Sequence, residues 1–402
     1  MLKKIISTYQ SSLIIAVLSF TTVWLTVHYL GTIGRGQISL FLLNLSIVQI
    51  ISSVVGSGSL VYLYSRHRLS NILLLTVGWA FICSVIAPII LLSIQMLPLQ
   101  QLFSTVFLSF LTSILLNNYA ILMARNQFFQ YNLMRVLQAV LNILFFVAFF
   151  YIFKKPQVQQ YILAMYLSYS AVVLLSFWLV FKKEPLMPLD NLPKTLTDFL
   201  KFGGLNQLSN IIQLGNYRAT LYMLSKYIGL GATGIFSLAL TLTEAVWMFK
   251  DSIVTNHHSY VAKQSNAQEA SKNNNKFMIM SGLGTLAVIT IALLMPLSVY
   301  TKVFGADFEV VKTLLFLLSP GIIALAIGAV VSHYFSGVGK IKYNTYTSFA
   351  GLIVVLVSGI YLIPQYGIKG AAVANALSYC TTSALLLLIY FGRIKKVNNS
   401  RG

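Results

Sequence analysis

The polar side chains best suited to binding a ligand cluster on one apolar segment near the middle of the chain. Between residues 197 and 224 they recur at a spacing of three or four, which places them on one helix face. This stripe consists of Asn206, Asn210, Gln213, Tyr217 and Thr220. Unsatisfied polar groups are costly in hydrocarbon, so the stripe is not expected to face lipid. Its amides favour a water-filled cavity, and hydrogen bonding to a neighbouring helix is the alternative.

Two charged residues lie deep in apolar segments, where a charge is a functional candidate by default. Arg218 is the deepest base and Glu244 the deepest acid. Their predicted depths differ by roughly 8 Å at about 1.5 Å per residue, so they pair only if the arginine reaches across. Arg218 also lies off the polar stripe. We therefore expect Glu244 to be either a coupling site for protons or other cations, or an ion-pair partner.

The composition identifies an integral membrane protein. The chain is 57% hydrophobic and 9% charged, with a mean hydropathy of +0.80, whereas soluble domains carry about 25% charged residues. Apolar runs long enough to cross about 30 Å of hydrocarbon recur throughout. We predict an all-α fold of about twelve transmembrane helices. Their ranges are 9–30, 36–64, 70–95, 99–123, 131–153, 158–181, 197–224, 230–253, 274–299, 310–335, 342–363 and 369–391.

The distribution of basic residues predicts the orientation. The net charge is +20, and all acidic residues follow position 183. Loops on one side hold eighteen Lys and Arg residues, including those at both chain ends, and loops on the other side hold six. The richer side is cytoplasmic by the positive-inside rule. Both termini are then expected in the cytoplasm, and nucleic acid is not expected as a partner.

Two similar segments indicate an internal duplication. Tyr29–Leu42 and Tyr227–Leu240 align at a shift of 198, and their shared positions include Gly31/Gly229 and Gly36/Gly234. A second pair of segments, around Tyr169 and Tyr379, aligns at a shift of 210. Halves with an even number of spans are parallel repeats. We predict an N-terminal six-helix bundle at 1–183, a proline-rich cytoplasmic linker at 184–196 and a C-terminal six-helix bundle at 197–402.

The glycine-rich turns also carry a resemblance to a known family. Y-L-G-x-x-G-R-G-Q-x-S-L at 29–40 and I-P-Q-Y-G-I-K-G-A-A-V-A-N-A-L-S at 363–378 resemble Wzx-type polysaccharide flippases. These belong to the superfamily of multidrug, oligosaccharidyl-lipid and polysaccharide (MOP) exporters. The resemblance implies two bundles around a central cavity, alternating access, and a location in the bacterial inner membrane. Its implied substrate is a polyprenyl-diphosphate-linked oligosaccharide repeat unit, such as an O-antigen or capsule unit. Multidrug relatives often have an acid in the first helix, and this chain has none there.

A cation-lined path suits such an anionic substrate. Arginine binds phosphate through two parallel hydrogen bonds, and tyrosine rings offer flat faces for sugars. We expect Arg218 to be the mid-membrane counter-charge, with Arg35 as an exposed charge at the outer mouth. The inner mouth is expected to hold Arg125, Arg135 and Lys250. For Arg125 and Arg135, snorkelling to lipid headgroups is the alternative. Screening weakens exposed charges, so Arg218 should matter more than those at the rim.

Other functions are less well supported by the sequence. An organic-cation exporter of the same fold needs carboxylates in the first bundle, and a membrane glycosyltransferase or polymerase needs a large outer loop or an acid cluster. A channel would need a filter motif. We therefore predict a transporter rather than an enzyme, with no cofactor and no metal. Expected partners are the lipid-linked glycan and membrane lipids, and a polysaccharide polymerase or other assembly protein is a further candidate.

Overall fold

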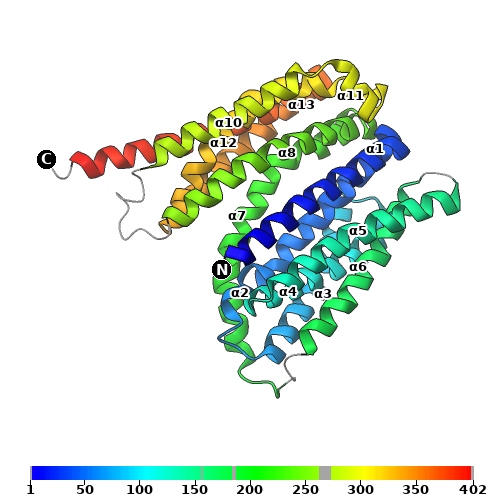
Figure 1. Cartoon of the computed structure of the whole chain (residues 1–402), viewed down its shortest axis with the longest axis vertical. Coiled ribbons are helices and arrows are strands. Elements are labelled where there is room, and N and C mark those ends of the chain that lie inside the picture. The colour runs from blue at the N-terminus through cyan, green and yellow to red at the C-terminus, as the bar shows by residue number, and fades with distance from the viewer. Residues whose placement is uncertain (1, 155–156, 183–186, 262–272, 400–402) are drawn as a thin grey trace. The chain divides into compact units, whose positions relative to one another are not determined.

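The fold is built from α-helices. The computed structural model describes residues 2–154, 157–182, 187–261 and 273–399, and these ranges contain helices and no strands (Figure 1). The longer helices are α1 (Leu2–Ser52), α3 (Leu69–Ser93), α4 (Leu102–Ala124), α5 (Phe128–Phe153), α6 (Val158–Phe181), α7 (Leu192–Tyr227), α8 (Leu230–Val261), α10 (Asn274–Leu294), α12 (Val311–Gly337) and α13 (Lys342–Asn399). The short helices are α2 (Ser57–Leu63) and α11 (Leu297–Phe304). The predicted all-α fold class is confirmed.

Each of the twelve predicted spans corresponds to helical structure. Nine segments of the described chain are long and apolar enough to cross a membrane. Two of these, Gln10–Leu63 and Lys342–Gly392, each contain two predicted spans, and α7 supplies the twelfth. The double spans are divided by Gly31 (φ 64°) and Gly367 (φ 56°). Both backbones are left-handed, a conformation that glycine adopts without strain.

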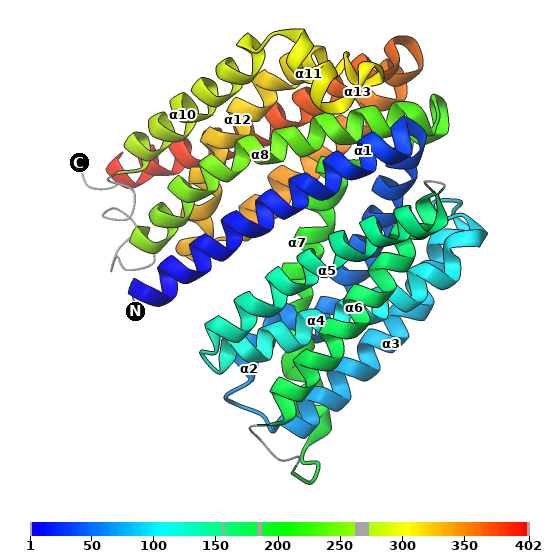
Figure 2. The ribbon, with the colours of Figure 1, turned by 45° about the vertical axis from the view of Figure 1, so that its right-hand side comes forward.

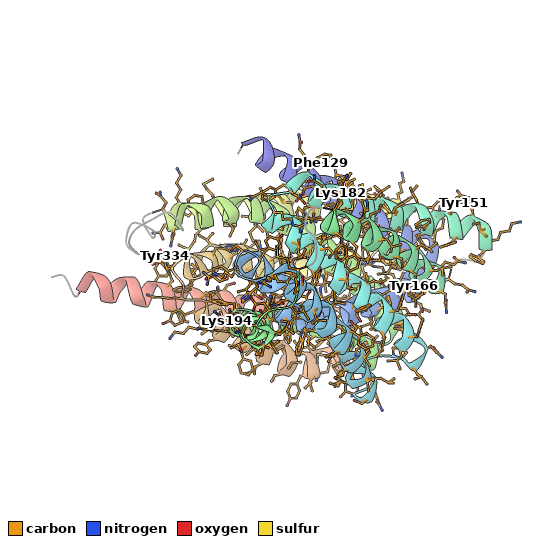
Figure 3. All side chains as sticks on the ribbon, turned by 90° about the horizontal axis from the view of Figure 1, so that it is seen from below. Phe129, Tyr151, Tyr166, Lys182, Lys194 and Tyr334 are labelled. Carbon is orange, nitrogen blue, oxygen red and sulfur yellow. The ribbon has the colours of Figure 1, made fainter. Side chains whose placement is uncertain are left out.

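The first compact unit comprises Met1–Leu30 and Gln37–Ile211. Within it α4 packs against α3 and α6, and α5 packs against α6 (Figure 2). The ends of α5 carry Phe129 and Tyr151, which are 70% and 68% exposed (Figure 3). Such apolar exposure is expected of a helix that faces lipid.

The first unit extends into α7, beyond the predicted linker. Phe199 of α7 is fully buried in a core that it shares with Leu60, Ile72 and Val180. A Cβ atom on Gly203 would lie 2.1 Å from the carbonyl oxygen of Val54, so only glycine permits this approach. The first half of α7 therefore packs with the N-terminal helices. The domain division at 184–196 remains a prediction, defined by the repeat rather than by packing.

The second compact unit comprises Gly31–Gly36 and Ile212–Gly402. Helix α12 is its centre and contacts α8, α10 and α13. Val254, Met278, Phe335 and Tyr390 from these four helices share one buried core. The short segment 31–36 also belongs to this unit, although it lies within α1.

The contact between segment 31–36 and α8 is symmetric in the register of the duplication. A Cβ on Gly36 would lie 2.0 Å from the Leu230 carbonyl oxygen, and a Cβ on Gly234 would lie 1.9 Å from that of Thr32. A shift of 198 converts Thr32 to Leu230 and Gly36 to Gly234, so it exchanges the two contacts. Small residues allow such close approach between membrane helices. The symmetry supports the proposed internal duplication.

We predict that Gly36→Ala and Gly234→Ala each destabilise the protein by about 1–3 kcal/mol, the usual range for overpacking. The new methyl group would collide with backbone atoms, which cannot rotate away. The midpoint of thermal unfolding of the purified protein in detergent measures the effect. Gly78→Ala is the matched control, because a Cβ at this helical position meets no atom within 4 Å. Unfolding midpoints equal to that of the control would contradict the close contact.

Candidate functional site

One face of α8 carries the predicted residue Glu244 and is contacted by several other predicted residues of the second unit. Ser237, Thr241, Glu244 and Trp247 follow one another at intervals of four, three and three, so they lie along one helix face. We call these four residues the α8 stripe. The hydroxyl groups of Ser237 and Thr241 donate to carbonyl oxygens of their own helix, at 2.8 and 2.9 Å. Their remaining lone pairs are therefore able to accept hydrogen bonds from outside the helix.

Arg35 uses these acceptors. Its Nε donates to Ser237 Oγ at 3.1 Å, and its Nη2 donates to Thr241 Oγ1 at 3.3 Å. Arg35 is 6% exposed. The prediction of an exposed rim charge is therefore wrong, because the turn at Gly31 and the Gly36–Gly234 approach bring this segment onto α8. Screening by solvent no longer gives a reason to rank Arg35 below Arg218.

Arg218 and Glu244 form the second contact of the stripe. The Arg218 Nη2 donates to Glu244 Oε1 in a hydrogen-bonded ion pair. At about 1.5 Å per residue they lie roughly 14 and 21 Å along their helices from the α7–α8 turn, and Glu244 falls shortly before the end of the apolar segment Leu230–Trp247. The long arginine side chain thus bridges the predicted difference in depth. The side chains remain 25% and 45% exposed, respectively, so the pair is open on one side.

An aromatic cluster continues the stripe beyond the ion pair. The ring centroid of Trp247 lies 5.4 Å from that of Tyr217 on α7 and 5.9 Å from that of Tyr379 on α13. The two tyrosine rings meet edge to face at 5.6 Å. Lys250 extends its Nζ to 5.2 Å from the Trp247 ring. The buried indole nitrogen of Trp247 has no hydrogen-bond partner among the described residues.

The predicted polar stripe of α7 is only partly assembled here. Gln213 donates to the Tyr217 hydroxyl at 3.2 Å, which places both beside the aromatic cluster. Thr220 is fully buried, and its hydroxyl finds no partner in the described part of the chain. Asn210 belongs to the first unit and donates to Gln207 at 2.9 Å. The side chain of Asn206 lies outside the described residues. The water-filled cavity remains a prediction.

Arg125 and Arg135 belong to the first unit. Arg125 donates to the Tyr64 hydroxyl at 2.7 Å and to the Val180 carbonyl oxygen at 2.8 Å. It therefore ties the end of α4 to α2 and α6. Arg135 is half-buried, 5.2 Å from the Tyr131 ring. These contacts give both residues structural partners, and their role in an entrance remains a proposal.

Ser237, Thr241 and Trp247 were not among the site residues predicted from the sequence. Their spacing around Glu244 was the available signal, since it places two hydroxyl groups and an indole on the same helix face as the acid predicted to lie deepest. The described residues include no group of three or more His, Cys, Asp or Glu side chains that could hold a metal ion. The side chains of His257 and His258 lie outside this description. What the site offers is charge, hydroxyl groups and aromatic surface.

Comparison with known proteins identifies the fold. No family model and no curated protein matches the sequence. A multidrug resistance MATE family transporter of the MOP superfamily, in an inward-facing conformation, superposes with a TM-score of 0.75 at 15% identity, over 98% of this chain and 96% of that one. Lipid II flippase MurJ, in an inward closed conformation, gives 0.76 at 13% identity, over 97% and 87%.

A third structure is a MOP superfamily transporter from Pyrococcus furiosus, with a TM-score of 0.62 at 16% identity, over 98% of this chain and 96% of that one. These identities are low, and the similarity extends over almost the whole chain. The protein is a multi-pass membrane protein with the fold of the MOP superfamily transporters.

Proposed function

We propose that this protein flips a polyprenyl-diphosphate-linked oligosaccharide repeat unit from the cytoplasmic to the outer leaflet of a bacterial inner membrane. Transport proceeds by alternating access, with both termini in the cytoplasm. The substrate combines a lipid tail that can stay in the bilayer with a strongly anionic diphosphate and a sugar head group. Only the last two parts need a polar path through the protein.

The observation that carries the proposal is the charge balance along the α8 stripe. Three cations, Arg35, Arg218 and Lys250, lie against it, and Glu244 is the one carboxylate described there. A diphosphate would face a prohibitive desolvation cost without such counter-charges. Arginine meets phosphate oxygens with paired donors, which lysine cannot do. The exposed side of the Arg218–Glu244 pair leaves donors within reach of a ligand.

Structures of the same fold support this substrate class. One neighbour is a flippase for lipid II. Another is described as having a binding pocket of reverse polarity that suggests a different function. Polarity of the pocket thus distinguishes functions on a shared scaffold. The cationic excess here favours an anionic substrate.

The ion pair suggests how transport is coupled. While Glu244 is ionised, it competes with phosphate oxygens for Arg218. Protonation of Glu244 removes the attraction and frees the guanidinium group for the substrate. The Tyr217 and Trp247 rings adjoin the pair and offer apolar faces to a sugar.

An organic-cation exporter is the alternative. Its support is the half-exposed Glu244 beside an aromatic cluster, a combination that attracts flat cations. The surrounding cations oppose it by electrostatic repulsion. Relatives of the same fold include MATE family transporters, so the alternative is tested together with the main proposal.

We predict that Arg218→Ala strongly reduces glycan display when it replaces the wild type in a flippase-deleted strain. A lost hydrogen bond to a charged group costs about 1.5–3 kcal/mol, which corresponds to a reduction in glycan display of about tenfold to a hundredfold. Arg218→Lys should retain part of the display, because it keeps the charge and loses the paired donors. Immunoblots check the protein level, and Lys226→Ala, an exposed base on the same helix, is the control.

The double variant Arg218→Ala with Glu244→Gln separates transport from stability. It removes both charges, so it relieves any cost of an unpaired carboxylate in the single variant. Our account expects normal protein levels without display. Restored display would mean that the pair is only structural. Normal transport by Glu244→Gln across pH and ion gradients would remove Glu244 from the coupling mechanism.

A further inference from the structure

Two large aromatic side chains lie exposed in contact with each other on the first unit. Tyr62 on α2 is 48% exposed, and Phe202 on α7 is 41% exposed. Their ring centroids are 4.9 Å apart, with the rings tilted by 56°. Exposed rings also face lipid at α5, and what sets this pair apart is the contact between the two rings and the cation beside each of them.

A cationic side chain lies near each ring. The Arg66 Cζ lies 4.2 Å from the Tyr62 ring centroid, and the Lys201 Nζ lies 6.0 Å from that of Phe202. Both cations are themselves exposed. We call Tyr62, Arg66, Lys201 and Phe202 the α2–α7 platform. An arginine stacked on a ring keeps its N–H groups at the edge, where they can donate to an anion.

Close helix packing brings the two halves of this platform together. A Cβ on Gly58 of α2 would lie 2.1 Å from the Gln207 side chain, and Gly203 of α7 has the close backbone approach to Val54 described above. A larger residue at Gly203 would meet backbone atoms and push α7 away from Val54, whereas at Gly58 the nearest atom is the flexible end of the Gln207 side chain. The close approach at Gly203 therefore holds Phe202, its neighbour in α7, near the helix that carries Tyr62.

A hydrogen-bond network holds the segment after α2 against the first turns of α7. His67, next to Arg66, contacts the Asp198 carboxylate at 2.9 Å and the Thr195 hydroxyl at 3.1 Å. Asp198 precedes Lys201 by less than one helical turn. Asn71 adds a hydrogen bond of 3.3 Å to Thr195.

The carboxylates that the structure describes in this region, Asp190 and Asp198, are both engaged. Asp198 contacts His67, and Asp190 lies 3.7 Å from Arg68. The described side chains thus leave Arg66 and Lys201 as cations beside the exposed rings. A surface held in place in this way loses little conformational entropy when it binds a ligand.

We propose that the α2–α7 platform is an initial binding site for the head group of a polyprenyl-diphosphate-linked sugar, before that group crosses the membrane. The proposal rests on the proposed function and on the predicted cytoplasmic location of the loop that follows α2 and contains Arg66. Arg66 and Lys201 bind the diphosphate oxygens, and Tyr62 and Phe202 pack against the sugar ring. The paired rings favour a sugar over a simple phospholipid headgroup, which needs cations alone.

The test uses the purified full chain in nanodiscs of phosphatidylcholine, which carries no net charge. The probe is farnesyl-diphosphate-linked N-acetylglucosamine, whose short chain keeps it soluble, and calorimetric titration measures its Kd. Tyr62→Ala and Phe202→Ala should each raise Kd by about tenfold, the effect of about 1.4 kcal/mol. Tyr62→Phe should stay within about twofold of the wild type, because it keeps the ring.

Two controls address the specificity of the platform. Trp178 is 59% exposed on α6 with Lys182 Nζ 4.7 Å from its ring, so Trp178→Ala removes a similar aromatic–cation pair elsewhere on the first unit. This variant should bind the probe like the wild type. Thermal unfolding confirms that each variant is folded. A second series with phosphatidylglycerol in the nanodiscs tests an anionic headgroup as competitor, and it should raise Kd by less than about threefold.

Several outcomes would overturn the inference. If both platform variants bind like the wild type, the rings do not recognise the sugar. If Trp178→Ala weakens binding equally, or phosphatidylglycerol displaces the probe, the cations are a general lipid-binding belt. Failure of the proposed function looks different, because a wild-type protein that binds no probe at all contradicts both proposals. A wild type that binds and flips while the platform variants remain unaffected contradicts this inference alone.

Discussion

A polar or charged group inside a membrane needs a partner within the protein, because hydrocarbon offers none. Helix α8 meets this requirement with a chain of contacts along one face. Its hydroxyls donate inward to the helix and accept from Arg35, while Glu244 accepts from Arg218. The charges along α8 thereby have partners within the protein. Arg218 and Glu244 remain partly exposed, and this exposure is the basis for proposing that the pair meets a ligand.

The glycine contact at Gly36 and Gly234 places Arg35 where it can join this chain of contacts. Without a Cβ on either residue, the segment after Gly31 lies directly on the start of α8. The same contact follows the register of the internal repeat, so one duplicated turn provides both sides of it. Backbone packing and charge placement are thus linked through two residues that carry no side chain.

The spans and the glycine turns could be predicted from the sequence because each depends on local signals. Hydrophobic length marks eleven of the predicted spans in the described chain, and Gly31 and Gly367 break helices through their own backbone preferences. The burial of Arg35 could not be predicted, since it depends on a contact between residues about two hundred positions apart. The sequence could not decide whether Arg218 and Glu244 pair, because small errors in the two predicted helix boundaries determine whether the charges meet. The α2–α7 platform was missed because Tyr62 and Phe202 become neighbours only through the packing of α7 onto the first unit.

The central claim is that the cationic face of α8 serves an anionic, lipid-linked glycan. Its most direct measurement is transport by the purified protein in proteoliposomes, with a fluorescent polyprenyl-diphosphate-linked disaccharide in one set and a fluorescent organic cation in another. The account predicts that the glycan lipid changes leaflet at a rate well above that of protein-free vesicles, and that the cation does not accumulate. Accumulation of the cation without movement of the glycan lipid would contradict the account and identify the protein as an organic-cation exporter.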